Sequence, residues 1–377
     1  MKASVRGFGR IVTLGCVSIV LSACSSQADK RQPEAKPATG ASAKAPVDLA
    51  PVKASIERGV AYLLQGQSSG PLLGGHPGVA AMALLAVAHS PKPLGKDDPR
   101  VAPTLAALAQ LAKPDGAIGG PDYSAYTTAL AALALQAFDV HPELVKKAQT
   151  WLTTQQFSES NGVEPSNVNW GGIGYGSKGD ADLSNLHYAL AALHDTHFSD
   201  KPEVYTRALK FIERCQNRSE SNDQPWAGND GGFIYRPGVS KAGTTASSGS
   251  MTYAGVNAFI YAKVDKTDPR VKDAFAWIRA HYSVTENPGL GLKGLYYYYH
   301  VMAQALALLG ESTLTDSQGV VHPWFAELSG QIMALQKPDG SWVNTDETYW
   351  EANPVIATSR ALLALEYGFA MSAQQAL

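Results

Sequence analysis

The segment AQTWLTTQQ at residues 148–156 recurs as ALKFIERCQ at residues 208–216, with the same spacing of its apolar residues. In both copies an alanine is followed three residues later by an aromatic residue and an aliphatic one, and the copy ends on a glutamine. A third copy contains Ala274, Trp277 and Ile278 but has Tyr282 at the glutamine position, and a weaker copy ends at Gln336. A Gly-rich turn and a second apolar stretch follow each copy. Two helices per unit at an irregular period of roughly 45–65 residues indicate a helical repeat array.

Six such pairs of helices fit between residues 52 and 377. The turns inside the pairs are expected at residues 74–75, 114–116, 170–176, 230–233, 287–289 and 338–342. The last expected helix, about residues 354–369, is as apolar as the middle ones, whereas an open array needs polar capping units at its ends. We therefore expect an all-α (α/α)6 toroid, in which outer and inner helices form two rings and the last pair packs on the first. A buried dimer face would give the same apolar pattern.

The composition excludes some classes of function. The chain has 377 residues, of which 45% are hydrophobic and 17% charged, so a folded core is expected. The formal net charge is −2. Since nucleic-acid binding rests on clustered positive charge, we expect no nucleic acid among the partners.

The N-terminus has the features of an export signal. Lys2, Arg6 and Arg10 precede an apolar run at residues 11–21 that is too short to span a bilayer as a stable helix. The run ends in Leu-Ser-Ala-Cys at residues 21–24, which resembles the lipobox of bacterial lipoproteins. This resemblance implies a signal peptide at residues 1–23, lipidation of Cys24, and, from Ser25, attachment to the outer membrane, with the periplasmic face the expected location. A plain secretory signal is the alternative.

Residues 24–51 are rich in Ala, Pro and Lys and contain almost no large apolar side chain. Such a segment cannot bury enough surface to offset the entropy of ordering, so it is expected to be a flexible tether. Residues 52–377 would form the toroid. Cys215 is the only other cysteine of the mature chain, so no internal disulfide is expected.

The turn QKPDGSW at residues 336–342 resembles the QW motif of squalene and oxidosqualene cyclases, and WGGIGYG at residues 170–176 is a looser copy. With the six helix pairs, this is similar to the α/α toroid superfamily of terpene cyclases, such as squalene–hopene cyclase, and protein prenyltransferases. The resemblance covers about residues 51–369. It implies that the motif residues are structural and that chemistry occurs in a central cavity built from the starts of the inner helices.

The resemblance also implies a candidate acid. Asp180-Ala-Asp182-Leu183-Ser184 lies where class II terpene cyclases carry D-x-D-D-T, so Asp182 would be the proton donor and Asp180 the first acid of the motif. Leu183 replaces the acid that normally follows. The alternative is that Asp182 only caps the helix that begins after it.

Other polar and aromatic residues of the inner helices are candidates for lining the cavity, because helix N-termini attract negative groups and aromatic faces stabilise cations. They are Asn185, His187, Tyr188, Tyr253, Tyr297, Tyr298 and His300. The run from Tyr296 to His300 exceeds one helical turn, so only part of it can face the axis.

Cofactor and metal chemistry has little support. Cys215 is expected at the end of an outer helix and no Asp-x-Cys sequence occurs, which argues against the zinc site of protein prenyltransferases. His194 and His197 could share a metal but are more typical of a helix end. Loop acids such as Glu286 and Glu351 could form carboxylate pairs suited to glycoside chemistry. No P-loop or dinucleotide fingerprint occurs. We expect no cofactor and no metal.

Taken together, the sequence predicts an exported, lipid-anchored toroid whose axial cavity binds an apolar or isoprenoid-like molecule, with or without catalysis. One alternative is a class II terpene cyclase-like enzyme with Asp182 as general acid. A second is an envelope scaffold that binds a protein partner, which the sequence does not identify.

Overall fold

Twelve α-helices and one short β-hairpin make up most of the regular structure in the described part of the computed structural model, residues 47–65, 71–176 and 179–375. The helices are α1 (Leu49–Gln65), α2 (Pro77–His89), α3 (Ala102–Gln110), α4 (Ser124–Ala137), α5 (Pro142–Thr154), α6 (Leu183–Asp195), α7 (Pro202–Cys215), α8 (Gly249–Tyr261), α9 (Pro269–Ala280), α10 (Leu295–Leu308), α11 (Trp324–Ala334) and α12 (Pro354–Gln375). The strands β1 (Leu314–Thr315) and β2 (Val321–His322) pair antiparallel between α10 and α11, with Leu314 opposite His322. One-turn 3-10 helices occupy Glu159–Asn161 and Thr348–Trp350.

The predicted signal peptide, Cys24 and most of the tether lie outside the described residues. The first helix begins at Leu49, before the expected end of the tether at residue 51. The carboxylate of Asp48 accepts the backbone N–H of Ala50 at 3.0 Å, which favours an early helix start. None of the described helices is both long enough and apolar enough to span a bilayer.

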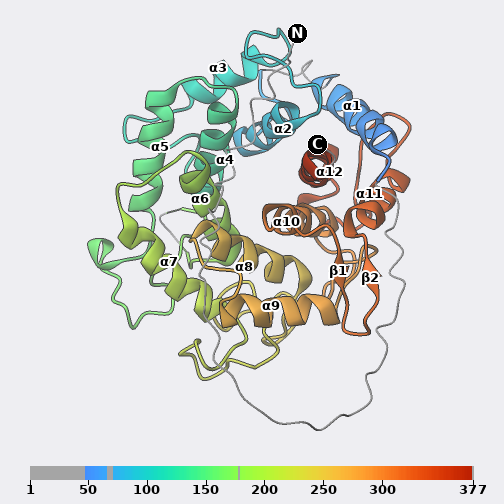
Figure 1. Cartoon of the computed structure of the whole chain (residues 1–377). Coiled ribbons are helices and arrows are strands. Elements are labelled where there is room, and N and C mark those ends of the chain that lie inside the picture. Colours follow the sequence, from blue (N-terminus) through green and yellow to red (C-terminus); the bar gives the residue numbers. More distant parts are fainter. Residues whose placement is uncertain (1–46, 66–70, 177–178, 376–377) are drawn as a thin grey trace, which may run out of the picture. The chain divides into compact units, whose positions relative to one another are not determined.

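Within the unit that begins at Val47, the even-numbered helices form a closed inner ring. Each inner helix packs on the next, in the order α2, α4, α6, α8, α10 and α12, and α12 packs on α2. The odd-numbered helices lie outside them, and α1 contacts both α11 and α12 (Figure 1). The predicted (α/α)6 toroid is therefore confirmed.

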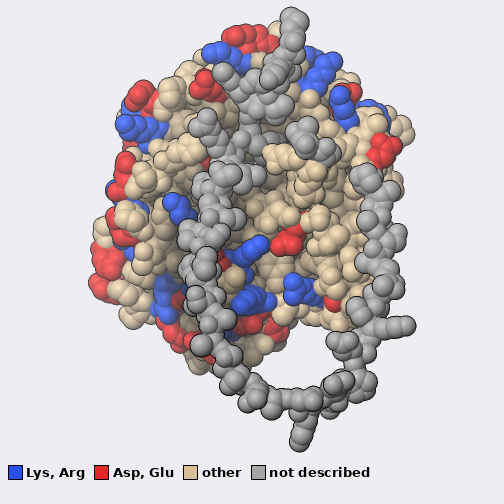
Figure 2. Space-filling model, viewed as in Figure 1, with Lys and Arg blue, Asp and Glu red and all other residues tan. Residues whose placement is uncertain are grey.

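The two rings differ in side-chain pattern. Outer helix α7 buries one face, including Val204, Phe211 and Ile212, and turns charged residues outward. Inner helix α8 is buried almost all round, as a helix enclosed by neighbours on every side must be. On the face drawn in Figure 2, acidic and basic side chains are interspersed around the periphery.

The repeated glutamines join successive units. The side-chain amides of Gln156, Gln216 and Gln336 each donate to a glycine carbonyl in the following turn and to a carbonyl in the next outer helix. The acceptors are Gly171 and Val204, Gly231 and Arg270, and Gly340 and Ser55, at 2.8–3.0 Å. Because Ser55 belongs to α1, the last of these links closes the ring.

The remaining residues of the 336–342 turn are also structural. Asp339 accepts the backbone N–H of Ser341 at 3.0 Å and its hydroxyl at 2.7 Å. Trp342 is fully buried and donates its indole N–H to the Ile332 carbonyl at 2.7 Å. The turn thereby fixes the crossing from α11 to α12.

Candidate functional site

Asp182 is the N-cap of α6. Its carboxylate accepts the backbone N–H of Asn185 at 2.9 Å and the side-chain amide of the same residue at 2.7 Å. The residue is only 2% exposed, and burial raises the pKa of Asp182 to about 6, although hydrogen bonds from Asn185 and Tyr235 act in the opposite direction. Asp182 is thus both a helix cap and a buried carboxyl group that can carry a proton near neutral pH.

Asp180 does not share this environment. Its side chain is half-exposed and pairs with Arg236 and with the amide of Asn169. Ala181 separates the two acids along the chain, and only the Asp182 carboxyl group is buried. The expectation that Asp180 belongs to the same acid motif is not met by this geometry.

Three polar side chains from α6, α10 and α12 meet near the starts of the inner helices. The ring centroids of Tyr188 and Tyr297 are 6.4 Å apart, and the Arg360 guanidinium lies 5.1 Å from the Tyr297 ring centroid. Neither tyrosine hydroxyl, nor Nε of Arg360, has a hydrogen-bond partner among the described residues. We call Asp182, Tyr188, Tyr297, His300 and Arg360 the axial site.

Arg360 is held in place by a buried carboxylate. Its Nη1 donates to Glu351 at 2.8 Å, and Glu351 is fully buried. Glu351 also accepts the backbone N–H groups of Tyr296 and Tyr297, at 3.1 and 2.8 Å, and the amide of Asn344 at 2.8 Å. Glu351 therefore caps α10 and orients Arg360, rather than belonging to a carboxylate pair at the mouth of the ring.

His187 lies in a second polar cluster between the inner helices. Its Nε2 is 2.9 Å from Oε1 of Gln304, whose amide donates to the hydroxyls of Tyr261 and Tyr367 at 2.9 and 2.8 Å. Since that amide oxygen only accepts, His187 must donate from Nε2. Burial lowers the pKa of His187 to about 4, so the ring is neutral at neutral pH. Its place in this cluster is a structural one.

His300 stacks on Tyr367, with ring centroids 5.9 Å apart, and lies 6.4 Å from Tyr188. Burial lowers its pKa well below the usual value, and the charge of Arg360 acts in the same direction. His300 is consequently a neutral, buried member of the axial site.

Tyr253 and Tyr298 do not line the axis, contrary to expectation. Their rings pack on each other at 5.8 Å, and the Tyr298 hydroxyl donates to the Ser283 carbonyl, just beyond α9, at 2.6 Å. Successive α10 residues are turned by about 100°. When Tyr297 faces the axis, Tyr298 therefore faces the outer ring.

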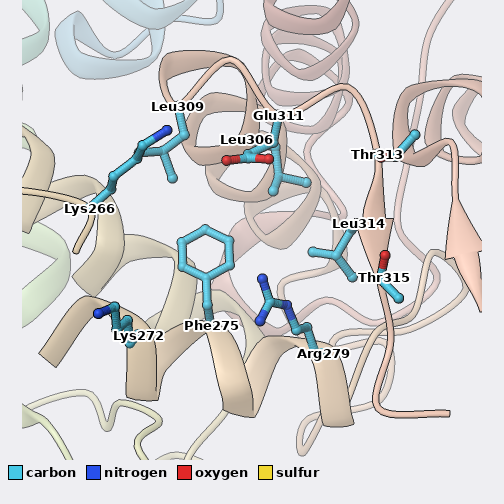
Figure 3. Close-up of a pocket in the computed structure, with 10 residues that line it drawn as sticks. All are labelled: Lys266, Lys272, Phe275, Arg279, Leu306, Leu309, Glu311, Thr313, Leu314 and Thr315. Atoms are coloured by element: carbon cyan, nitrogen blue, oxygen red, sulfur yellow. The ribbon is translucent and has the colours of Figure 1, made fainter. Parts of the chain in front are cut away.

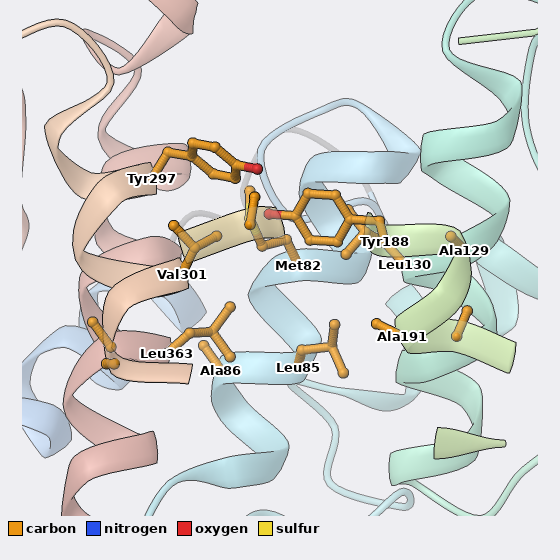
Figure 4. Packing of buried hydrophobic residues seen from close by; sticks show 14 of the residues in the cluster. Met82, Leu85, Ala86, Ala129, Leu130, Tyr188, Ala191, Tyr297, Val301 and Leu363 are labelled. Carbon is orange, nitrogen blue, oxygen red and sulfur yellow. The ribbon is translucent and has the colours of Figure 1, made fainter. Parts of the chain in front are cut away.

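Below the tyrosines the axis is packed with aliphatic side chains. Met82 and Leu85 from α2, Val301 from α10 and Leu363 from α12 are at most 6% exposed. Figure 4 shows Tyr188 and Tyr297 reaching toward one another from α6 and α10, with Met82 and Val301 just below them and Leu85 and Leu363 farther down. The predicted hollow is thus filled over this part of its depth, because the inner helices approach closely enough for their side chains to meet.

Exposed aromatic residues form a cluster beside the axial site, since Tyr175 lies near Tyr126 and Tyr126 packs on Tyr188; we call this cluster the aromatic entrance. The Tyr123 ring meets those of Tyr175 and Trp350 edge-on, at centroid distances of 5.1 and 6.1 Å. Trp350 is 63% exposed. Tyr123, Tyr349 and Trp350 have φ of 59°, 60° and 67°, which is rare for bulky residues and often marks functional segments. The Tyr175 hydroxyl faces inward, where burial and the charge of Asp182 raise the pKa of Tyr175 to about 12.

Two pockets lie outside the inner ring. One of about 320 Å³ is bounded by α9, the end of α10 and β1, where Phe275 lies between Lys272 and Arg279 on α9 (Figure 3). The other is a shallow surface between α3 and α5. Within the part of the chain that the structure describes, no three His, Cys, Asp or Glu side chains are grouped as metal ligands.

Comparison with known proteins supports the fold. No protein-family model matches the chain, and no curated protein matches it in sequence. The apo structure of type II terpene cyclase MstE from Scytonema matches with a TM-score of 0.55 and 15% identity, over 86% of this chain and 99% of the cyclase. An arginine variant of MstE with geranylgeranyl dihydroxybenzoate, its substrate, matches with a TM-score of 0.53 and 15% identity over the same shares.

A protein from Actinoplanes has a TM-score of 0.50 and 14% identity, over 84% of this chain and 99% of that protein. The chain therefore has a terpenoid cyclase/prenyltransferase-like α/α toroid fold, as the QW-like turn indicates.

Sequence reasoning did not single out several residues of the site and its entrance. Arg360 belongs to no motif. Tyr175 lies in the QW-like turn at residues 170–176 but was not among the candidate site residues, and Tyr123 and Trp350 lie in turns whose left-handed backbone a sequence does not reveal. One signal was available for Arg360. It is the only charged residue in the apolar stretch from Val355 to Leu365, where a cation needs a buried partner.

Proposed function

We propose that the chain is an exported, lipid-anchored toroid whose axial site binds an apolar or isoprenoid-like molecule. The observation that carries this proposal is the set of buried polar atoms without partners among the described residues, on Tyr188, Tyr297 and Arg360, next to aliphatic walls from α2, α10 and α12. Unpaired buried polar groups are costly, so a native site that contains them is expected to meet a ligand or water there.

The likeness to MstE points to the same class of ligand. Structures of that cyclase were solved with a geranylgeranyl substrate and a merosterolic acid product. The variants among them replace an aspartate, an arginine or a tyrosine. Asp182, Arg360 and the site tyrosines offer the same residue types in one place. Export and lipid attachment are supported by the basic start, the apolar run and Cys24.

A class II cyclase-like activity is the second candidate, and one observation favours it. Asp182 is buried and its pKa is about 6, so roughly a tenth of the molecules carry this proton at pH 7, far more than for an ordinary aspartate. Such an acid could protonate an alkene held against it, with the faces of Tyr188 and Tyr297 stabilising the cation that results. The absence of a second acid at Leu183 argues for ligand binding as the primary role.

Native mass spectrometry of the full chain with geranylgeraniol tests both candidates. Binding predicts a 1:1 complex from which the alcohol is recovered unchanged. Catalysis predicts a cyclised product whose formation is lost in Asp182→Asn. If geranylgeraniol forms neither a complex nor a product, the proposed axial function is wrong and a protein-binding role for the entrance becomes the better hypothesis.

A further inference from the structure

Four buried polar atoms of the axial site have no hydrogen-bond partner among the described residues. The hydroxyls of Tyr188 and Tyr297 and Nε of Arg360 can donate, and Nδ1 of the neutral His300 donates or accepts according to its tautomer. Burial raises the pKa of Tyr188 and of Tyr297, so both hydroxyls keep their protons, and Nε of a guanidinium is always a donor. The hydroxyl of Tyr126 lies within reach of the Tyr188 hydroxyl and of the Arg360 guanidinium, and the hydroxyl of Ser184 lies within reach of that of Tyr297. Three donors from α6, α10 and α12 therefore point into one buried region.

The charges of this region are already balanced. The guanidinium of Arg360 is paired with Glu351, whose carboxylate accepts four hydrogen bonds. Asp182 adds a further negative charge whenever it is ionised. A ligand anion would place a third acidic group around a single cation, which costs free energy in a buried site. A neutral oxygen acceptor satisfies the donors without that cost.

The route to this region is lined by aromatic side chains. Tyr126 is half-buried and packs edge-on against Tyr188 at 4.9 Å. It lies in the first turn of α4, whose N-cap is Tyr123. Tyr123, Tyr175 and Trp350 then lead outward to solvent. A ligand with its oxygen at the three donors would have its apolar body along these rings.

We propose that the axial site recognises a neutral carbonyl oxygen, as in a long-chain ketone or quinone, through the hydroxyls of Tyr188 and Tyr297 and Nε of Arg360. This inference rests on the proposed function and specifies the head group of the ligand. The apolar remainder of the ligand then accounts for the exposed aromatic entrance.

The test is a competition among 2-undecanone, undecane and undecanoate for the full chain, measured by native mass spectrometry. The ketone is expected to bind about tenfold more tightly than undecane, as one or two buried hydrogen bonds would give. In Tyr188→Phe/Tyr297→Phe that preference should disappear while undecane binding stays. Tyr298→Phe/Tyr299→Phe is the matched control, because those hydroxyls bond to the Ser283 and Val284 carbonyls, and it should keep the preference.

The outcomes separate this inference from the proposed function. If undecane or undecanoate binds as tightly as the ketone, or if the double variant keeps the ketone preference, the head-group assignment is wrong while the apolar site stands. If none of the three molecules binds, the proposed function itself is wrong. Each single Tyr→Phe variant gives a partial loss of preference, which serves as the readout if the double variant does not fold.

Discussion

Asp182 is the residue whose effect on the pH dependence of folding stability can be predicted most directly. Its pKa is about 6 in the folded chain against 3.8 for the free side chain, so the folded state binds the proton more tightly. Stability is therefore highest below about pH 4 with respect to this group and falls as the pH rises through 6, by about 3 kcal/mol. Asp182→Asn keeps a capping side chain and removes this loss.

Urea unfolding of the native chain and Asp182→Asn at pH 4, 5, 6 and 7 measures the difference. The variant should gain stability relative to the native chain as the pH rises from 4 to 7. Asp180→Asn is the control, since it removes a half-exposed carboxyl group from the same segment. Parallel curves for native and Asp182→Asn would show that Asp182 is not buried as described.

At the scale of the elements, the two adjacent glutamines that follow α5 provide a matched pair. Gln156 is fully buried and bonds to two backbone carbonyls, whereas Gln155 reaches only the neighbouring Thr154 hydroxyl. Gln156→Ala leaves buried acceptors without a partner and should cost about 1–3 kcal/mol of unfolding free energy. Gln155→Ala should change it by less than about 0.5 kcal/mol. If denaturant melts show equal losses for Gln156→Ala and Gln155→Ala, the repeated glutamine does not join successive units.

The turn after α5 makes a similar comparison possible for glycine. Gly171 has φ of +86°, and a Cβ there would lie 2.0 Å from the Arg207 carbonyl oxygen of α7. Gly162 has φ of +79° but open space around it. Gly162→Ala therefore carries only the backbone strain, about 1–2 kcal/mol.

Gly171→Ala adds a clash with backbone that cannot move without shifting α7, so its cost should exceed that of Gly162→Ala by about 1–3 kcal/mol. Thermal melts of the two variants give the comparison. If Gly171→Ala is no worse than Gly162→Ala, α7 does not approach the turn as closely as the structure indicates.

The helix pairs and their closure into a ring could be predicted from the sequence. The spacing of Ala148, Trp151 and Gln156 placed the helix pairs, and the apolar last helix indicated closure. The sequence was not sufficient for the site. Which of four consecutive tyrosines faces the axis depends on the rotation of α10, which is set by packing against α8 and α12. The same is true of Arg360, whose partner Glu351 lies in a turn with no motif.

At the scale of the whole molecule, closure makes the first unit indispensable. A Cβ on Gly59 of α1 would come within 2.7 Å of Trp342 and 2.8 Å of Leu362, so α1 packs tightly on the last unit. In an open array a terminal unit can be lost without unfolding its neighbours. Here, a chain lacking Leu49–Gln65 should lose cooperative unfolding altogether in calorimetry. A truncated chain that melts like the native one would contradict the closed ring.

Attachment to the membrane depends on a single residue in the proposed scheme. Cys24→Ser should abolish incorporation of radiolabelled fatty acid and release the chain into the soluble envelope fraction, because no other lipid anchor is predicted from the sequence. Cys215→Ser serves as the control, since Cys215 is buried at the end of α7. Labelling that persists in Cys24→Ser would mean that the N-terminal segment is not a lipoprotein signal.

Hydrogen–deuterium exchange of the full chain, with and without geranylgeraniol, tests the location of binding most directly. Binding at the axis predicts slower exchange in the first two turns of α6, α10 and α12, next to Asp182, Tyr297 and Arg360, and little change in the outer helices. Slower exchange confined to α9 and the β-hairpin, or no change anywhere, would contradict an axial ligand site.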